Sequence, residues 1–282
     1  MRQFDRQYRL AAGPAGGAGF VVGAMTEENP TALHVRFLIN KCDSETPNTA
    51  TISLWNLNPS QLAVLNRGGC IVTLRAGYGQ HRALVFVGAV TYIETSLDKG
   101  DRETYIELAD GRVELQDCYV SQSYAGQINT KKIIQDVATQ MGVAVSFSYN
   151  AGFINLNGFS FVGPARVALD KACASSNLQW GIQNGILQIK RRNDTMTREV
   201  YLLNPESGLL GIPKKITYAA EGDAEEQSGY EVEYLLNGAI GIGDFIRLES
   251  MVVKGYFRIK TLELRGDNLE GDWICTAKLI DA

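Results

Sequence analysis

Residues 33–110 alternate between hydrophobic and polar side chains in a series of short stretches. In NTATISLWNLNPSQL, residues 48–62, Ala50, Ile52 and Leu54 point to one side of a predicted strand, and the Thr and Ser residues between them point to the other. Gly, Asn, Asp and Pro separate the successive stretches LHVRFLIN, TATISLWNL, CIVTLRAGY, ALVFVGAVTYIET and ETYIELAD. This spacing predicts a small β-barrel or sandwich.

The second of these strands ends at Trp55, which breaks the alternation. The following NLNPS combines side chains that make local backbone hydrogen bonds with a proline that cannot donate to a ladder, so the strand must stop here. We expect Ser60 to cap a short helix, SQLAVLN.

The hydrophobic period changes in the middle of the chain. After Thr130, the segment KKIIQDVATQMG places four apolar residues on one helical face, and Gly142 stands where a left-handed cap is expected. The apolar residues of this face are Ile133, Ile134, Val137 and Met141. The segment therefore predicts an amphipathic helix, and a strand, VAVSFSY, follows it.

A second helix, PARVALDKACASS, opens at Pro164, because proline suits the first turn of a helix. Asn184-Gly185 then separates the alternating runs LQWGIQ and ILQIKR. This dipeptide is the strongest short-range signal of a β-hairpin, since both turn residues need positive φ. A helix followed by a strand thus occurs twice, which predicts a small α+β domain over residues 112–200.

From about residue 200 the pattern returns to strands: EVYLL, KKITYAA, GYEVEYLL, DFIRLESMVV, GYFRIKTLELRG and DWICTAKLID. An offset of 171 residues superposes Phe86 on Phe257, Gly100 on Gly271, Asp101 on Asp272 and Asp110 on Asp281. This match indicates an internal duplication. We therefore predict a mainly β protein with an α+β insert: two related β-barrel-like domains, residues 1–111 and 201–282, flank a small α+β domain at residues 112–200.

At 282 residues the chain is long enough for two or three domains. No apolar run approaches the roughly 20 residues that span a bilayer. The amino terminus MRQFDRQYRL is charged where a signal peptide is apolar, so we expect synthesis and folding in the cytoplasm. The five cysteines form no CxxC pair, which favours buried free thiols over a disulfide framework or a zinc site. They are Cys42, Cys70, Cys118, Cys173 and Cys275.

The formal net charge of −4 argues against a protein that grips nucleic acid through its phosphates. It does not argue against a protein that nucleic acid passes through. The basic run Lys190-Arg191-Arg192 closes a predicted strand and is interpreted as a solvated strand end. The stretch AAGPAGGAG, residues 11–19, is too rich in glycine to settle into one element without help from neighbours.

No catalytic group stands out. His34 is interpreted as a strand residue with a satisfied ring nitrogen, and His81, in GYGQHR, as a solvated loop residue. No GxSxG motif precedes a helix, so a serine hydrolase has no anchor. The segment AEGDAEEQSGY is interpreted as a solvated acidic loop, which lacks the apolar surroundings that raise one carboxyl pKa above another. Its acids are Glu221, Asp223, Glu225 and Glu226.

GAIGIGDF, residues 238–245, leads into a strand rather than a helix, so we interpret it as a tight β turn and not as a phosphate site. Trp55, Trp180 and Trp273 lie in strand patterns of three different predicted domains. This distribution favours burial in three separate cores over a sugar-stacking platform. We expect no cofactor and no metal site.

The segment NTATISLWNLNPSQL, followed by CIVTLRAGY and LVFVGAVTYIE, resembles the amino-terminal domain of the baseplate hub, or tail hub, proteins of tailed bacteriophages. Typical family features are an Asn-Thr/Val-Ala entry, an aromatic-Asn-Leu exit, an Ala-Gly-Tyr turn and a Phe/Ile-x-Gly strand. They fall here on Asn48, Thr49 and Ala50; on Trp55, Asn56 and Leu57; on Ala76, Gly77 and Tyr78; and on Phe86 and Gly88.

Three carboxy-terminal segments are similar to the same family. GLLGIPKKI matches its Gly-Leu-Ile/Leu-Gly-x-Pro segment, YLLNGAIGIGDFIRLES its Pro/Ile-Gly-Asp turn, and LRGDNLEGDWICTAKL its closing hairpin. The matching residues are Gly208, Leu209, Leu210, Gly211, Pro213, Gly243, Asp244, Gly266, Asp267 and Trp273. The resemblance covers nearly the whole chain in the same order.

The resemblance implies two related β domains per chain and a trimeric ring of six similar domains. Such a ring adapts the sixfold tail tube to a threefold spike or tip, and its lumen carries the genome or the tape-measure protein. An acidic wall suits that conduit, because it does not hold DNA in passage. The middle domain would bind other baseplate or tip proteins. The protein would reside in the virion tail after assembly in the host cytoplasm, and the chain carries no fused lysozyme-like or peptidase domain, so we expect no wall-degrading activity.

Two other functions stay open. A carbohydrate-binding or cell-surface-binding β module would expose its tryptophans to a soluble quencher. A peptidoglycan hydrolase acting through the acidic loop would lose its activity when Glu225 and Glu226 are neutralised, whereas a hub would change little.

Overall fold

The computed structural model describes residues 5–14, 16–23, 32–43, 46–98, 100–111, 118–192, 194–218 and 227–281. It divides into two compact units. The first comprises the described residues within Met1–Asp43, Asn48–Ala109 and Glu199–Ala282, and the second those within Ser44–Pro47 and Asp110–Arg198. Each unit is described by itself.

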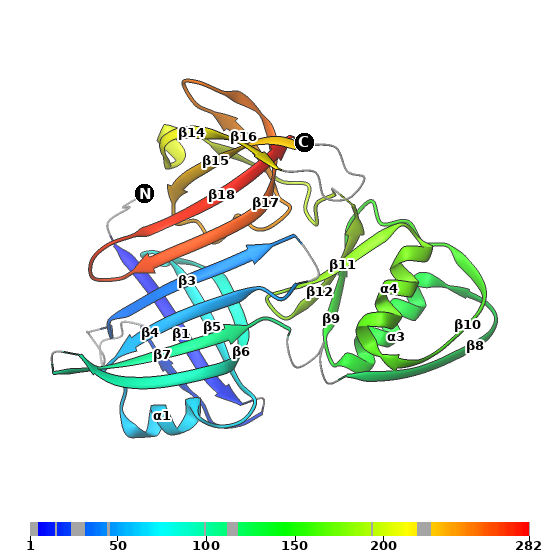
Figure 1. Ribbon diagram of the computed structural model, residues 1–282, viewed down its shortest axis with the longest axis horizontal. Helices are drawn as coiled ribbons and strands as arrows, with labels where there is room; N and C mark the ends of the chain where they lie inside the picture. The colour runs from blue at the N-terminus through cyan, green and yellow to red at the C-terminus, as the bar shows by residue number, and fades with distance from the viewer. Residues whose placement is uncertain are drawn as a thin grey trace. The chain divides into compact units, whose positions relative to one another are not determined.

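Strands from both ends of the chain form one hydrogen-bonded sheet in the first unit. Its strand order is β14-β15-β18-β17-β3-β4-β7-β6-β5-β1-β2, with β16 paired to β17 and β13 paired to β16 (Figure 1). The strands are β1 (Arg6–Pro14), β2 (Phe20–Val22), β3 (Val35–Cys42), β4 (Thr49–Trp55), β5 (Cys70–Tyr78), β6 (His81–Asp98), β7 (Asp101–Ala109), β13 (Val200–Leu203), β14 (Leu209–Tyr218), β15 (Gln227–Leu235), β16 (Phe245–Glu249), β17 (Lys254–Asp267) and β18 (Trp273–Asp281). Two short helical segments accompany them, α1 (Pro59–Leu65) and the 3-10 helix η1 (Pro205–Ser207).

The fold is mainly β with an α+β insert, as the sequence predicts. No closed barrel is detected in the described part of the chain; the strand path runs from β14 at one end to β2 at the other. The domain boundaries after residues 111 and 200 stay a prediction.

The two β regions repeat one strand topology. In the amino-terminal region the strand order is β3-β4-β7-β6-β5-β1, and in the carboxy-terminal region it is β14-β15-β18-β17-β16-β13. In each region the strand that comes last in the sequence lies beside the long strand that precedes it: β7 lies between β4 and β6, and β18 lies between β15 and β17. The outermost pairs differ, since β1 is antiparallel to β5 whereas β13 is parallel to β16.

A β-bulge stands at the same place in both repeats. Thr91 is the extra residue of β6 opposite β7, and Lys260 is the extra residue of β17 opposite β18. When the two bulges are aligned, equivalent residues of β6 and β17 are 169 positions apart. Equivalent residues of β7 and β18 are 171 positions apart, as predicted. The predicted superposition of Phe86 on Phe257 is therefore wrong by two residues, because the hairpin turn of the second repeat is longer. In the register of the sheet, Gly88 is the equivalent of Phe257.

Helix α1 begins one residue earlier than predicted. Asn58 is its N-cap: the Asn58 side chain accepts a hydrogen bond from the backbone N–H of Gln61 at 2.9 Å, and the Gln61 side chain accepts one from the N–H of Asn58 at 2.9 Å. The expectation that Ser60 caps the helix is wrong, because Pro59 occupies the first helical turn.

In its described residues, the second unit has two helices and two small sheets. Its elements are β8 (Tyr119–Asn129), α3 (Thr130–Met141), β9 (Ala144–Phe147), β10 (Asn155–Pro164), α4 (Ala165–Ser175), β11 (Leu178–Gln183) and β12 (Ile186–Arg191). Strands β8 and β10 form an antiparallel pair, and β12 lies between an antiparallel β11 and a parallel β9.

Two local predictions in the second unit are confirmed, whereas Pro164, predicted to open the second helix, ends β10 and is the N-cap of α4. The predicted apolar face of α3 is buried, and Gly142 ends the helix in the left-handed conformation with φ of 72°. Asn184 and Gly185 turn the β11–β12 hairpin with φ of 54° and 76°. The Asp110 carboxylate accepts hydrogen bonds from both of their backbone N–H groups, that of Gly185 at 2.9 Å.

All five cysteines are free thiols; Cys70, Cys173 and Cys275 are buried, whereas Cys42 and Cys118 are half-buried. Burial raises the pKa of the Cys275 thiol to about 11. Among the described residues, no helix has the length and apolar character needed to cross a membrane.

Candidate functional site

The antiparallel pairing of β3 with β17 joins the two repeats. It extends from Cys42 opposite Thr261 to Arg36 opposite Asp267. Gly266 lies opposite Phe37 in this ladder, and a Cβ atom at Gly266 would lie 2.1 Å from the Cζ atom of Phe37. Glycine is therefore required at position 266 for the Phe37 ring to pack against the backbone of the facing strand.

The carboxylate of Asp267 is the centre of this joint. Its Oδ1 accepts hydrogen bonds from the backbone N–H groups of Leu269 at 3.0 Å and Glu270 at 3.1 Å. Across the joint, His34 Nε2 lies 3.0 Å from Oδ1, and Arg36 Nε donates to Oδ2 at 3.2 Å. Burial tends to raise the pKa of Asp267, but the backbone donors and His34 outweigh it, so this pKa lies below its ordinary value.

Trp55 extends the joint to β4. Its ring stacks on the His34 imidazole, with centroids 3.9 Å apart and planes inclined by 16°, and the Arg36 guanidinium carbon lies 5.4 Å from its centroid. His34 and Arg36 are thus each held by both Trp55 and Asp267. These contacts connect β4 of the first repeat with the end of β17 in the second.

The turn after β17 is further tied to the segment before β3. Asn268 accepts a hydrogen bond from the Val35 N–H at 2.8 Å and donates to the Leu33 carbonyl at 3.1 Å. Arg6 donates to the Asp267 backbone carbonyl at 2.8 Å, and its guanidinium lies 6.0 Å from the Trp273 centroid. Sequence reasoning missed Arg6 and Asn268 because neither stands in a recognisable local motif.

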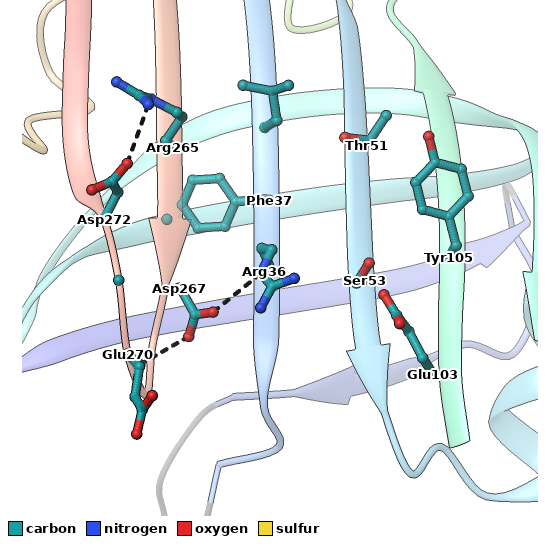
Figure 2. Close-up of a pocket in the computed structure, with 13 residues that line it drawn as sticks. Arg36, Phe37, Thr51, Ser53, Glu103, Tyr105, Arg265, Asp267, Glu270 and Asp272 are labelled. Carbon is teal, nitrogen blue, oxygen red and sulfur yellow. Dashed lines mark hydrogen bonds and ion pairs between the residues drawn. The ribbon is translucent and has the colours of Figure 1, made fainter. Parts of the chain in front are cut away.

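A groove of about 680 Å³ lies over the polar face of the sheet at this joint. Its lining residues come from β7, β4, β3 and β17 and from the turn that follows β17. Figure 2 shows Arg265 directed toward Asp272 and Arg36 toward Asp267. The labelled lining residues are Arg36, Phe37, Thr51, Ser53, Glu103, Tyr105, Arg265, Asp267, Glu270 and Asp272. Arg265 lies 3.2 Å from Asp272 and 3.1 Å from Glu263. The arginines of the groove thus form ion pairs with neighbouring carboxylates, an arrangement that suits a polar wall rather than a pocket for one small ligand.

The first group of resemblance residues shapes turns of the amino-terminal repeat. Asn48 is buried and accepts a hydrogen bond from the Cys42 N–H at 3.0 Å, and Asn56, with φ of 59°, donates to Asp101 at 2.9 Å. Leu57 is buried in the core.

Close backbone contacts surround Gly77 and Gly88. A Cβ at Gly77 would lie 1.9 Å from the His81 carbonyl oxygen, and one at Gly88 would lie 2.8 Å from the Ala109 carbonyl oxygen. Tyr78 is buried at the end of β5. These positions fix the β5–β6 hairpin and the approach of β6 to β7.

The carboxy-terminal resemblance residues lie at turns and bulges. Gly208 ends η1 with φ of 113°, and Gly211, with φ of 61°, stands beside buried Pro213 in the bulge of β14. Gly243 has φ of 82°, and Asp244 accepts a hydrogen bond from the Gly241 N–H at 2.8 Å. The tight turn predicted at residues 238–245 is confirmed.

The tryptophans do not occupy three separate cores, and this prediction is wrong. Trp273 is 2% exposed in the core of the first unit and Trp180 is 6% exposed in that of the second, whereas Trp55 is only half-buried. The cause is the joint, because its stack on His34 leaves one part of the Trp55 ring at the surface.

The remaining candidates give no reactive centre. His34 has a hydrogen-bond partner, as predicted, and His81 is exposed but begins β6 instead of lying in a loop. Arg191 and Arg192 are exposed, but Lys190 is 6% exposed, so the solvated-end interpretation is wrong for Lys190. The acidic loop with Glu221, Asp223, Glu225 and Glu226 lies outside the described residues. In the described ranges, no group of three His, Cys, Asp or Glu side chains could hold a metal ion.

Comparison with known proteins identifies a family. The family described as "Baseplate hub gp41" matches residues 20–264. No curated protein matches the chain in sequence.

Solved structures share the fold at low sequence identity. The 43 kDa tail protein of prophage MuSo2 from Shewanella oneidensis has a TM-score of 0.65 at 11% identity, with 98% of each chain covered. A tail protein from Neisseria meningitidis MC58 has a TM-score of 0.64 at 10% identity, covering 98% of this chain and 97% of that one. The E. coli c3393 protein, a component of the type VI secretion system, has a TM-score of 0.60 at 9% identity, covering 88% and 73%. At these identities the likeness shows a common fold alone.

Proposed function

Since the chain belongs to the baseplate hub gp41 family of phage tail proteins, we propose that three copies form a ring that adapts the sixfold tail tube to a threefold spike or tip. The observation that carries this proposal is the repeated strand topology with its matching bulges at Thr91 and Lys260. Two similar β regions in each of three chains would present six similar units around one axis.

The joint at Asp267 would fix the geometry of such a ring. A ring of three chains closes only if the rotation within each chain and the rotation between neighbouring chains together make one third of a turn, so the contact between repeats has to hold one orientation. Glycine at position 266 permits close strand packing, while His34 and Arg36 tie β3 to the turn after β17. Interactions that join residues so far apart in sequence set the orientation of the two repeats.

Charge is distributed unevenly between the β regions and the insert. Residues 110–198 carry nine Lys or Arg and six Asp or Glu residues, a net charge of +3, which leaves −7 for the rest of the chain. A lumen built from the β regions would therefore be electronegative. Such a wall lets DNA or the tape-measure protein pass without holding nucleic acid.

The expected partners follow from the hub role. They are two further copies of this chain, the tail tube protein, the central spike or tip protein, the tape-measure protein and other baseplate proteins, with the insert as the outer docking domain. Assembly would take place in the host cytoplasm before incorporation into the virion tail. We expect no cofactor and no sequence-specific DNA contact.

Light scattering on the purified protein, followed by negative-stain imaging, tests this function. A mass of three chains and an annulus with an open, sixfold-looking centre are expected. A monomer at every concentration, without annuli, would contradict the ring.

A separate assay tests the absence of wall-degrading activity. Purified peptidoglycan should stay turbid in the presence of the protein, with a lysozyme as the positive control. Clearing that disappears in a variant with Glu225→Gln and Glu226→Gln would favour the hydrolase.

A further inference from the structure

Strands β6 and β14 each have an edge without a partner strand within the described residues of the first unit. Strand β6 pairs with β5 through residues 81–89 and with β7 through residues 89–98, so its edge on the β5 side is open beyond Ala89. Strand β14 pairs with β15 on one side and stands at the end of the strand order. Both edges therefore offer backbone groups to a further strand.

The chain itself contains the template for covering these edges. Strand β17 is the equivalent of β6, because each is the long, bulged strand of its repeat. Strand β3 is the equivalent of β14, because each stands first in the spatial strand order of its repeat. Within the chain, residues 261–267 of β17 pair antiparallel with residues 36–42 of β3, on the same side as β16. Among the described residues, the corresponding segment of β6 in the first repeat has no partner strand within the same chain.

We propose that the open edge of β6 in one copy pairs antiparallel with β14 of a second copy, as β17 pairs with β3 within one chain. This interface rests on the proposed ring function and specifies which surfaces close the ring. It is a head-to-tail contact between two different surfaces, so it continues from copy to copy until the ring is closed.

The register of this interface follows from the register of the joint. The starting pairs are Cys42 with Thr261 and the four pairs that follow it in the joint. Each residue of β17 is replaced by its equivalent in β6, found by aligning the bulges, and each residue of β3 by its equivalent in β14, found by aligning the β3–β4 and β14–β15 ladders. The resulting pairs are Tyr92 with Tyr218, Ile93 with Thr217, Glu94 with Ile216, Thr95 with Lys215, and Ser96 with Lys214.

The exposed side chains of the two edges fit this pairing. Tyr92 is 48% exposed and Leu97 is 77% exposed on β6, and Ile212 is 68% exposed on β14. Each is a large apolar side chain on an open edge, where a monomeric protein usually places charged residues instead.

The two edges are also complementary in charge. Glu94 on the β6 edge would lie diagonal to Lys214 of the second copy, within reach across an antiparallel pair. The Lys214 side chain is 73% exposed, and its Nζ lies as far as 3.9 Å from Glu231 Oε1 of its own chain, so a second carboxylate can approach the ammonium. Behind β6, the neighbouring strand β7 adds Glu103 and Glu107 to the acidic edge.

A cross-linking experiment locates the interface. Thr95→Cys together with Lys215→Cys places one thiol on each edge at the same level of the ladder, and both positions are exposed. After mild oxidation, a non-reducing gel should show covalent dimers and trimers that variants with only one of the two added cysteines do not form. A register control, Thr95→Cys with Thr217→Cys, should cross-link at least tenfold less, because a disulfide tolerates only a short Cβ–Cβ distance.

The mass from light scattering is measured on the same samples, so that the two proposals can fail separately. A trimer that forms no cross-link beyond those of the variants with one added cysteine would overturn this interface and leave the ring in place. A monomer without cross-links would overturn both the ring and the interface.

Charge reversal supplies an independent measurement. Glu94→Lys and Lys214→Glu should each weaken trimer formation roughly fivefold, and combining them should restore it. Glu206→Lys, at an exposed position of η1 outside the two paired segments, carries the same charge change and should leave assembly unaltered. Additive weakening in the double variant would contradict the proposed proximity of Glu94 and Lys214.

Discussion

His34 Nε2 lies 3.0 Å from Asp267 Oδ1, although 233 residues separate them in the chain. This contact connects the segment before β3 with the turn that follows β17, and it is reinforced by the stack of the His34 ring on Trp55. The two repeats therefore meet in a polar, hydrogen-bonded joint next to the apolar contact between Phe37 and Trp273. The apolar contact stabilises the association of the two repeats, while the directional hydrogen bonds specify one orientation of the repeats.

Asp267→Asn should lower the free energy of unfolding by about 2 kcal/mol, because the charged acceptor of four hydrogen bonds is replaced by a neutral amide. Urea denaturation followed by far-UV circular dichroism measures the change. Glu270→Gln removes a neighbouring but exposed charge and should alter stability by less than about 0.5 kcal/mol. Equal effects of the two substitutions would show that Asp267 is not central to the joint.

Stability should fall in acid in a way that depends on Asp267. The folded state depresses the pKa of this carboxyl, so its contribution is fully present above the unfolded pKa of about 4 and is lost as the pH falls through the lower folded value. Denaturation curves between pH 7 and pH 3 should show a steeper loss for the wild type than for Asp267→Asn. Parallel profiles for the two proteins would refute the coupling.

The features that the sequence predicted correctly are those with local causes. The Asn184-Gly185 turn needs positive φ at two adjacent residues, and the buried face of α3 follows from helical spacing alone. The Asn58 cap could also have been found, since proline favours the first helical position and the preceding residue is then the cap.

The joint could be anticipated only in part. Trp55, Gly266 and Asp267 stood out through the family resemblance, but their convergence depends on the pairing of β3 with β17, which periodicity does not encode. The alignment of Phe86 with Phe257 failed for a similar reason. A bulge and a longer turn shift the register by two residues, and neither changes the hydrophobic alternation in a way that marks it.

Asn58→Ala should destabilise the protein by about 1 kcal/mol, because the backbone N–H of Gln61 loses its acceptor at the start of α1. Ser60→Ala changes the residue that the sequence suggested as the cap, and it should alter stability by no more than a few tenths of a kcal/mol. Thermal unfolding of the two variants compares them directly. A larger loss for Ser60→Ala would mean that the helix begins later than the structure places it.

Gly266→Ala tests the close approach at the joint. The added methyl would lie 2.1 Å from Phe37 Cζ, so either the ring or one of the two strands must move, at a cost of about 1–3 kcal/mol. Gly68→Ala is the matched control, because no atom lies within 4 Å of a Cβ at that position and its φ is not in the left-handed region.

Phe37→Leu removes the atoms that meet the new methyl, so the double variant Phe37→Leu with Gly266→Ala should lose less stability than the sum of the single changes. Strict additivity would place the strain elsewhere in the β3–β17 ladder. If the joint also sets the angle between repeats, Gly266→Ala should weaken trimer formation under conditions in which the chain remains folded, whereas Gly68→Ala should leave it unchanged.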